Sequence, residues 1–209
     1  MMPVDWLHLG YELVTYYFEF TIGRSHYTHF AIGCHSIGLV ASSSSFPHWN
    51  DFIEEEIFGS YNCIVFHMTD LPYGRGGSPL QNLILNGFKN TKISAIKVTS
   101  ELDAGDIYLK RELNLSGSAN EIYSRASKII FEEMIPFIVN NNPTPIMQAG
   151  KPVYFSRRKP SQSELSGDKI NLERLYDFIR MLDADGYPNA FLKSNGLKFP
   201  FNKAKFNGQ

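Results

Sequence analysis

The most constraining feature of the sequence is a short apolar run that ends in a loop rich in glycine. The run covers residues 63–68 and reads Cys-Ile-Val-Phe-His-Met, without the polar/apolar alternation of a half-buried strand. Such a run is typical of a strand covered on both faces, as in a parallel sheet. The loop over 69–77 contains three glycines and one proline. Because ligands of open α/β sheets bind beyond the carboxyl ends of strands, this edge is a candidate site.

Helix and strand patterns alternate along the following residues. The spacing of apolar residues predicts a helix over 78–86 that stops at Gly87, and strands over 93–99 and 107–113. A capping box, Ser118-Ala119-Asn120-Glu121, opens a longer helix. Pro136 should kink or end that helix. This alternation favours an α/β sheet.

Charge and breaker residues predict a domain boundary near residue 150. Residues 1–150 carry 9 Lys and Arg against 15 Asp and Glu, whereas residues 151–209 carry 11 against 6. The stretch 140–145, Asn-Asn-Asn-Pro-Thr-Pro, interrupts regular structure at the same place. We therefore predict a main domain over 1–150 and a small C-terminal α+β subdomain over 151–209. Within the main domain, residues 1–45 show no clear periodicity, and 12–22 is assigned only as a strand or a helix.

The C-terminal segment contains one helix and one hairpin by its local signals. Asn171 is positioned to cap a helix whose inward residues are expected to be Leu172, Leu175, Ile179 and Leu182. Tyr154-Phe155 is predicted as a short strand. The pair Asn195-Gly196 is a strong signal for a type I′ turn between two further strands.

Composition excludes several classes of protein. Hydrophobic residues make up 43% and charged residues 20% of the chain, which is ordinary for a globular protein. The net charge of −1 provides no general basic surface for nucleic acid. The two cysteines, Cys34 and Cys63, have no zinc-ligand spacing and do not indicate a disulfide scaffold. With no apolar stretch of the ~20 residues a membrane span needs and no signal peptide, we expect a cytoplasmic protein without a membrane partner.

Two elements carry residues suited to catalysis. His67 ends the buried strand, a position that favours function, although a hydrogen-bonded core histidine is an equal alternative. The segment 101–107, Glu-Leu-Asp-Ala-Gly-Asp-Ile, places three acids in one loop between two strands. Taken alone, this loop is best interpreted as a solvated turn; a metal site and a catalytic carboxylate remain the alternatives.

Together, the two motifs resemble the folate-dependent formyltransferase superfamily. The matching residues run from Phe46 to Phe206 and are centred on Phe66-His67-Met68-Thr69-Asp70-Leu71-Pro72-Tyr73-Gly74-Arg75-Gly76-Gly77 and Leu102-Asp103-Ala104-Gly105-Asp106-Ile107. The segments 155–160 and 186–191 are similar to those that follow the catalytic domain in sugar formyltransferases. The resemblance implies a Rossmann-like, mostly parallel sheet.

The resemblance also implies a reaction and a set of site residues. In this superfamily a formyl group passes from N10-formyltetrahydrofolate to a primary amine, and no metal is required. His67 would stabilise the tetrahedral oxyanion, and Asp103 would set the charge of the histidine and help to remove the amine proton. The folate contacts would come from Thr69, Asp70, Leu71 and Pro72. Arg75, Gly76 and Gly77 would face an anionic substrate, although a loop ion pair is an equal alternative for Arg75.

Two departures from the family pattern stand out. The family usually has an asparagine two residues before the histidine, and this chain has Val65 there. The family also opens with a complete strand–helix–strand unit, so we expect a shortened or altered N-terminal unit.

The acceptor is expected to be a nucleotide-linked amino sugar, because the chain ends before the separate basic domain of methionyl-tRNA formyltransferases. A methionyl-tRNA formyltransferase is the alternative, and tRNA would be the partner only in that case. A third interpretation, which the two departures motivate, is a non-catalytic relative that binds folate or a nucleotide.

Overall fold

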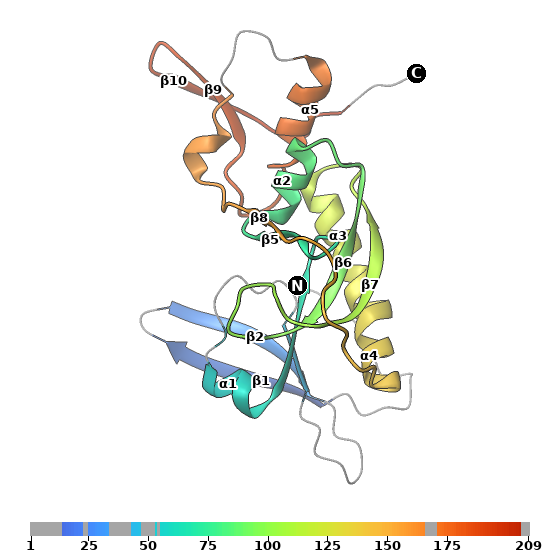
Figure 1. The fold of residues 1–209 in the computed structure, drawn as a ribbon. Coiled ribbons are helices and arrows are strands. Elements are labelled where there is room, and N and C mark those ends of the chain that lie inside the picture. Colours follow the sequence, from blue (N-terminus) through green and yellow to red (C-terminus); the bar gives the residue numbers. More distant parts are fainter. Residues whose placement is uncertain are drawn as a thin grey trace.

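The structure, a computed structural model, describes residues 14–22, 25–33, 43–46, 53, 55–165 and 171–205 (Figure 1). The first element is an antiparallel hairpin of β1 (Val14–Ile22) and β2 (Ser25–Gly33). Of the two alternatives for residues 12–22, the strand is therefore correct over the described part. Its sequence, VTYYFEFTI, contains many β-branched and aromatic residues, which favour strands even without clean alternation.

The central sheet has four strands in the order β3-β4-β6-β7. These are β3 (Ser43–Phe46), β4 (Asn62–His67), β6 (Asn90–Lys97) and β7 (Ile107–Asn114). Helix α1 (Glu55–Ser60) lies between β3 and β4 in the chain, and these two strands are parallel. The pairs β4–β6 and β6–β7 are antiparallel.

The α/β class is thus confirmed, whereas the prediction of a mostly parallel sheet is wrong for the described strands. The apolar run at β4 indicates burial on both faces, and Cys63 and Ile64, whose side chains point to opposite faces, are both buried. Burial does not determine strand direction. The acidic loop 98–106 joins β6 directly to β7 without a crossover helix, which antiparallel neighbours allow and parallel neighbours do not.

Three helical segments cover the sheet (Figure 1). Helix α2 (Pro79–Leu85) buries Leu80, Leu83 and Ile84, as predicted, and the chain leaves it through Gly87 at φ 78°. Helix α3 (Ala119–Ile129) begins with the predicted capping box. It continues through a π-helical turn, η1 (Ile130–Met134), into α4 (Ile135–Asn141).

Pro136 does not end this helical run, which corrects one of the two predicted outcomes. The proline lies in the first turn of α4 and lacks the N–H that would continue the α-helical hydrogen bonds. The π-helical turn directly before it changes the local hydrogen-bond pattern, so the chain continues as a helix to Asn141.

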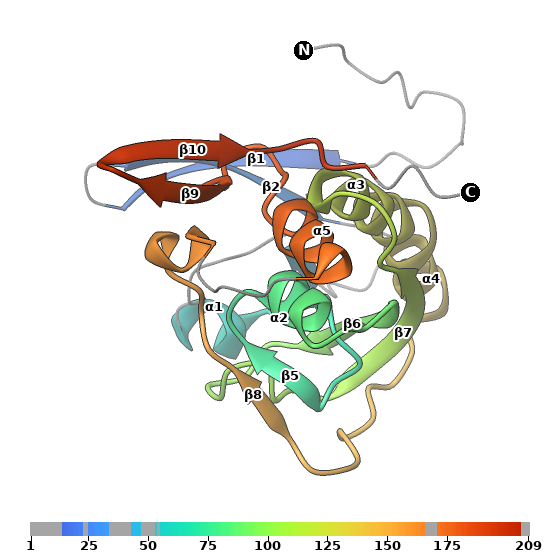
Figure 2. The same cartoon turned by 90° about the horizontal axis from the view of Figure 1, so that it is seen from above.

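The C-terminal segment packs on the same core. Strand β8 (Val153–Phe155) pairs in parallel with β5 (Tyr73–Gly76), and a 3-10 turn, η2 (Pro160–Ser163), follows. Helix α5 (Leu172–Arg180) lies on α2, as Figure 2 shows. Its predicted cap is confirmed, since Asn171 Oδ1 accepts a hydrogen bond from Arg174 N at 2.8 Å. Leu172 is 74% exposed, so the prediction that it points inward is wrong.

The last two described strands, β9 (Ala190–Ser194) and β10 (Leu197–Phe201), form a hairpin. Its turn residues, Asn195 and Gly196, have φ values of 50° and 78°, as a type I′ turn requires. The division at residue 150 stays a prediction, although β8, directly beyond it, hydrogen bonds to β5. Across the described residues, the helices are too short or too polar for a membrane span.

Candidate active site

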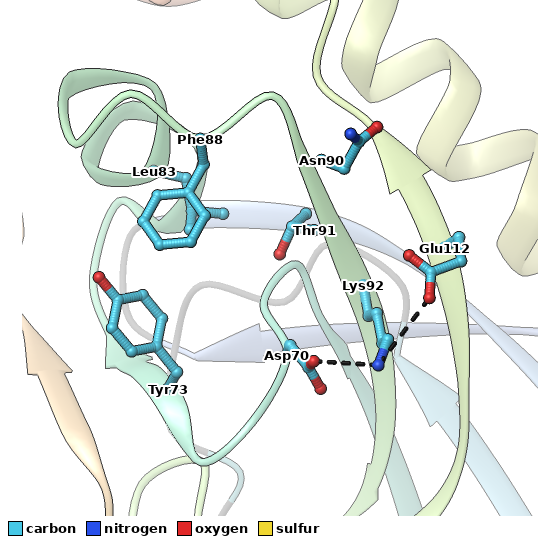
Figure 3. Close-up of a pocket in the computed structure, with 8 residues that line it drawn as sticks. All are labelled: Asp70, Tyr73, Leu83, Phe88, Asn90, Thr91, Lys92 and Glu112. Carbon is cyan, nitrogen blue, oxygen red and sulfur yellow. Dashed lines mark ion pairs between the residues drawn. The ribbon is translucent and has the colours of Figure 1, made fainter.

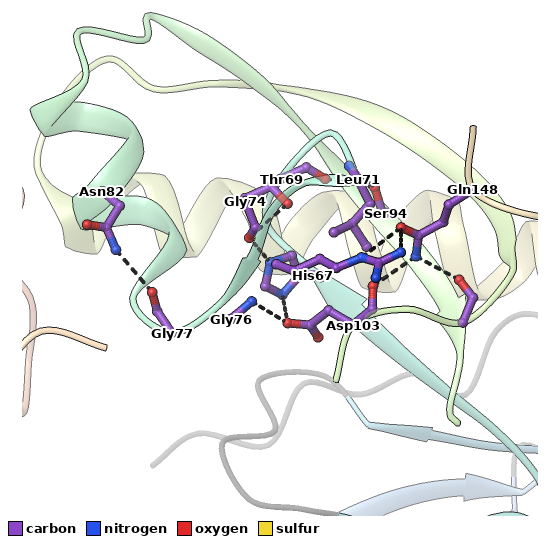
Figure 4. Close-up of polar contacts among 12 residues, drawn as sticks. His67, Thr69, Leu71, Gly74, Gly76, Gly77, Asn82, Ser94, Asp103 and Gln148 are labelled. Atoms are coloured by element: carbon purple, nitrogen blue, oxygen red, sulfur yellow. Dashed lines mark hydrogen bonds and ion pairs between the residues drawn. The ribbon is translucent and has the colours of Figure 1, made fainter. Parts of the chain in front are cut away.

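His67 and Asp103 meet in space, although they come from loops that are 36 residues apart in the sequence. His67 is the last residue of β4, and Asp103 lies in the loop between β6 and β7. His67 Nδ1 is 3.5 Å from Asp103 Oδ2, and the two side chains are 10% and 12% exposed (Figure 4). The predicted proximity is therefore confirmed, while the catalytic roles stay a prediction.

The imidazole of His67 faces an oxygen atom from each of its ring nitrogens. Its Nε2 lies 2.8 Å from the carbonyl oxygen of Gly74, which can only accept a hydrogen bond. Nε2 must therefore carry a proton, which fixes the tautomer of the neutral ring and turns Nδ1 toward Asp103. Only the imidazolium form donates from both nitrogens. The site is thus arranged so that a positive charge on His67 is matched by the Asp103 carboxylate.

Asp103 is held by hydrogen bonds at its side chain and at its backbone. Its Oδ2 accepts from Gly76 N at 2.8 Å, and its carbonyl oxygen accepts from Gln148 Nε2 at 2.8 Å. The residue has a φ of 53°, in the left-handed region that residues with a side chain rarely adopt. These contacts maintain a backbone conformation that directs the carboxylate at His67.

Arg75 is buried and is committed to partners within the protein. Its Nη1 donates to Glu101 Oε1 at 3.0 Å, and its Nε and Nη2 both donate to Gln148 Oε1, at 3.2 and 2.9 Å. The guanidinium also contacts Tyr154 through the phenol oxygen. This arrangement favours the loop ion pair over the predicted contact with an anionic substrate.

Gly76 and Gly77 allow the chain beyond residue 150 to approach the site. A Cβ atom on Gly76 would collide with the carbonyl oxygen of Phe155, and one on Gly77 would collide with Arg157. Gly77 N donates to Phe155 O at 3.1 Å. The close backbone approach that glycine allows is present here with the segment 155–157, while contact with an anionic substrate stays a prediction. The basic residues 157–159 consequently begin directly beside the site.

The loop over 69–72, which is predicted to contact folate, is held in place by buried side chains and two hydrogen bonds. The side chains of Thr69 and Leu71 are buried. Ser94 Oγ donates to Thr69 O at 2.7 Å, and Lys110 Nζ donates to Leu71 O at 2.5 Å. Asp70 and Pro72 therefore provide the loop's accessible side chains. Sequence reasoning missed Ser94, for which the signal was a serine between the apolar residues Ile93 and Ala95.

A shallow pocket lies beside this loop, beyond the carboxyl end of β4 (Figure 3). Tyr73, Leu83 and Phe88 form its apolar side, and Asp70, Lys92 and Glu112 form an ion-pair cluster on the other. Burial opposes the charge of Asp70, but hydrogen bonds from Lys110 and Lys92, together with their charges, lower the pKa of Asp70 overall. The carboxylate is thus ionised at neutral pH and neutralised by lysines.

The place of the family's asparagine is taken by Val65, two residues from His67 on the same face of β4. The candidate substitutes for its amide have other partners. Asn82 Nδ2 donates to the carbonyl oxygens of Gly77, Ser78 and Ser156, and the buried Thr69 hydroxyl faces Gly74 O at 3.5 Å. Asn62 instead accepts from Tyr108 at 2.7 Å. Among the described residues, these side chains are therefore engaged elsewhere, and a backbone N–H stays the alternative donor beside His67.

Replacing Val65 with asparagine is expected to raise kcat for formyl transfer by about 10- to 100-fold, because it restores a donor for the oxyanion. The Michaelis constant for N10-formyltetrahydrofolate should change little. Val65→Leu is the matched control, since leucine has nearly the shape of asparagine but no donor. Equal rates in the two variants would show that another group already performs this role.

The comparisons with known proteins support the same family. A family model described as "Methionyl-tRNA formyltransferase, C-terminal domain" matches residues 160–209. The methionyl-tRNA formyltransferase of Lactobacillus acidophilus is 27% identical over 158 residues, which are 72% of this chain and 50% of that protein. That of Bacillus velezensis is 32% identical over 142 residues, 65% of this chain and 44% of that protein. The chain thus spans about half the length of the curated relatives it matches.

Among the solved structures, one similar protein has a higher sequence identity to this chain than the curated relatives above. A sugar N-formyltransferase from Shewanella sp, 19% identical, has a TM-score of 0.65 with coverage of 80% of this chain and 71% of that one, and shows the shared fold. The structure of methionyl-tRNA formyltransferase from Clostridium thermocellum is 55% identical, with a TM-score of 0.77 and coverage of 80% of this chain and 74% of that one. Given that identity over most of both chains, this chain belongs to the folate-dependent formyltransferase superfamily.

Proposed function

We propose that this chain carries the catalytic site of an enzyme that transfers a formyl group from N10-formyltetrahydrofolate to the amine of methionyl-tRNA. The observation that carries the proposal is the pairing of His67 with Asp103 at 3.5 Å in a member of this superfamily. A buried His–carboxylate pair at a strand end can stabilise negative charge and accept a proton within one site.

The chemistry follows from the geometry of the pair. The acceptor amine attacks the formyl carbon, and the carbonyl oxygen becomes an oxyanion. Nε2 of His67 is committed to Gly74 O, whereas Nδ1 lies 3.5 Å from Asp103 Oδ2, which is longer than an ordinary hydrogen bond, so the Nδ1 proton of the imidazolium can be donated to an oxyanion that forms beside it. The Asp103 carboxylate balances that charge and accepts the amine proton, directly or through water. The C–N10 bond then breaks while N10 takes up the proton that Asp103 accepted, so tetrahydrofolate leaves and Asp103 is a carboxylate again.

The folate would lie along the loop 69–72, which Ser94 and Lys110 hold in place. Asp70 and Pro72 are the side chains of that loop that a pterin or aminobenzoyl group can reach. A fixed loop of this kind lowers the entropic cost of binding, because it needs no ordering when the ligand arrives.

The choice of acceptor rests on the relatives and on charge. The 55% identical relative is named a methionyl-tRNA formyltransferase, and the model for the C-terminal domain of such enzymes matches residues 160–209. Residues 151–209 carry 11 Lys and Arg against 6 Asp and Glu, which suits a polyphosphate partner. These relatives favour tRNA over the nucleotide-linked amino sugar expected from chain length.

Formyl transfer from N10-formyltetrahydrofolate to methionyl-tRNA, and separately to UDP- and TDP-linked amino sugars, tests the proposal. Methionyl-tRNA should be the better acceptor, and its Michaelis constant should rise steeply with salt because phosphate contacts release counterions. Free methionine serves as the control that lacks the tRNA. Transfer to an amino sugar alone would overturn the choice of acceptor and leave the formyltransferase activity standing.

Equilibrium binding of 5-formyltetrahydrofolate, a non-reactive mimic of the donor, tests the cofactor separately. Saturable binding is expected, and Asp70→Ala should weaken it while leaving the buried loop residues in place. Absence of binding, together with absence of transfer to every acceptor, would favour a non-catalytic relative.

A further inference from the structure

Gln148 connects three segments that are distant in sequence, and each of its amide atoms has two partners (Figure 4). Nε2 donates to the carbonyl oxygens of Asp103 and Gly105, each at 2.8 Å. Oε1 accepts from Nε and Nη2 of Arg75, at 3.2 and 2.9 Å. A primary amide has two N–H donors and one oxygen with two lone pairs, so its hydrogen-bonding capacity is filled.

The orientation of this amide is fixed by its neighbours. A guanidinium only donates hydrogen bonds, and a backbone carbonyl oxygen only accepts them. Rotating the amide of Gln148 by a half-turn would place donors against Arg75 and an acceptor against Asp103 and Gly105. Every contact would then be repulsive, so the network admits one orientation only.

Arg75 in turn fixes the position of the Gln148 side chain. Arg75 is 8% exposed and its guanidinium also donates to Glu101, so the Gln148 side chain is bound to a buried group that has a second partner. Gly105 adds a steric constraint on the same loop, because a Cβ atom there would collide with the carbonyl oxygen of Lys97. Contacts of Gln148 and Lys97 with its backbone therefore hold the loop that carries Asp103 in place.

We propose that Gln148 is a positioning residue that keeps Asp103 directed at His67, an inference that rests on the proposed function for its catalytic meaning. The backbone of Asp103 is in the left-handed region, at φ 53°, and relaxes away unless its surroundings hold it. Gln148 supplies that restraint on the carbonyl side, while Gly76 N fixes the carboxylate at 2.8 Å. Without Gln148, the Asp103 carboxylate is no longer held at its present distance from the His67 imidazole, nor kept pointing toward it.

Two variants of Gln148 separate this role from simple support of the fold. Gln148→Glu keeps the acceptor for Arg75 and removes both donors to the Asp103 loop, whereas Gln148→Met removes all four contacts. Both should lower kcat by about 100-fold, as misplacement of a catalytic group by about 1 Å does, with the Michaelis constant for N10-formyltetrahydrofolate within about threefold of wild type. Gln162→Glu is the matched control, since Gln162 is exposed and uses only its Oε1, on Lys159 N.

Amide hydrogen exchange of Gly76 gives a readout that needs no acceptor and no turnover. Its N–H is bonded to the Asp103 carboxylate, so loosening Asp103 should speed its exchange by about tenfold or more in both Gln148 variants, but not in Gln162→Glu. Faster exchange at Gly76 together with full activity of Asp103→Asn would overturn the role of Asp103 in the proposed function and leave the positioning intact. Wild-type exchange at Gly76 in folded Gln148→Glu would overturn the positioning role itself.

Discussion

Replacing His67 with alanine is expected to lower kcat for formyl transfer by about 100- to 1000-fold, the cost of removing one donor to a developing oxyanion. The imidazole is the group whose Nδ1 faces Asp103 while Nε2 is bound to Gly74 O. Asp103→Asn should cause a loss of similar size, because the amide neither balances the imidazolium nor accepts the amine proton. Steady-state rates at saturating N10-formyltetrahydrofolate measure both effects.

The two substitutions should not be additive. If His67 and Asp103 act as one unit, the double variant loses about as much as either single variant, because the second change removes an interaction that is already absent. Asp106→Asn is the matched control, since it changes a second carboxylate in the same loop, away from the imidazole. A fall in rate in Asp106→Asn equal to that in Asp103→Asn would mean that the loop acts through its net charge, and not through the geometry of Asp103.

The fold of the His67→Ala variant should remain intact. His67 ends β4, and its polar contacts are the ion pair with Asp103 and the hydrogen bond to Gly74 O. Thermal unfolding followed by circular dichroism checks this directly. A variant that is both inactive and unfolded would instead support the hydrogen-bonded core histidine that the sequence leaves as an alternative.

Features fixed by neighbouring residues were predictable from the sequence. The capping box at Ser118 and Glu121 closes within one helical turn, and the turn at Asn195 and Gly196 depends on two residues that tolerate positive φ. The same locality explains the correct end of α2 at Gly87. These signals depend little on the rest of the chain.

Features that depend on distant partners were not predictable in this way. The direction of β6 relative to β4 depends on how the chain crosses the sheet, and the apolar run of β4 reports only its burial. Gln148 is 45 residues from Asp103, and no local pattern distinguishes it from a surface glutamine until Arg75 and the loop are placed beside it. Leu172 continues the apolar stripe of α5 but lies at the helix end, beyond the packed surface.

The contacts of the motif residues were predictable only in part. The proximity of His67 and Asp103 was predictable from a resemblance that fixes their order and spacing. The resemblance did not determine the partners of Arg75, which pairs with Tyr154 of β8 and forms an ion pair with Glu101 of the loop between β6 and β7. A motif thus identifies the residues that gather at a site more reliably than it assigns each residue a partner.

Arg180→Met is expected to destabilise the protein by about 3–5 kcal/mol, the cost of removing one partner from a buried charged network. Arg180 lies on α5, is 3% exposed and donates from Nη1 to the carbonyl oxygens of Leu115 and Gly117, at 2.5 and 2.9 Å. Methionine fills a similar volume but leaves the buried Leu115 carbonyl oxygen, the half-buried Gly117 carbonyl oxygen and the Asp177 carboxylate without this donor. The midpoint of urea unfolding measures the effect.

The shape of that transition also tests the predicted boundary at residue 150. Arg180 joins the C-terminal segment to the loop after β7, so a cooperative protein should show one transition that moves to lower urea as a whole. Arg174→Met is the matched control on the same helix; its side chain is exposed, and the expected change is within about 0.5 kcal/mol. A separate early transition in Arg180→Met, with the remainder unchanged, would mean that residues 151–209 unfold as an independent subdomain held in place by this arginine.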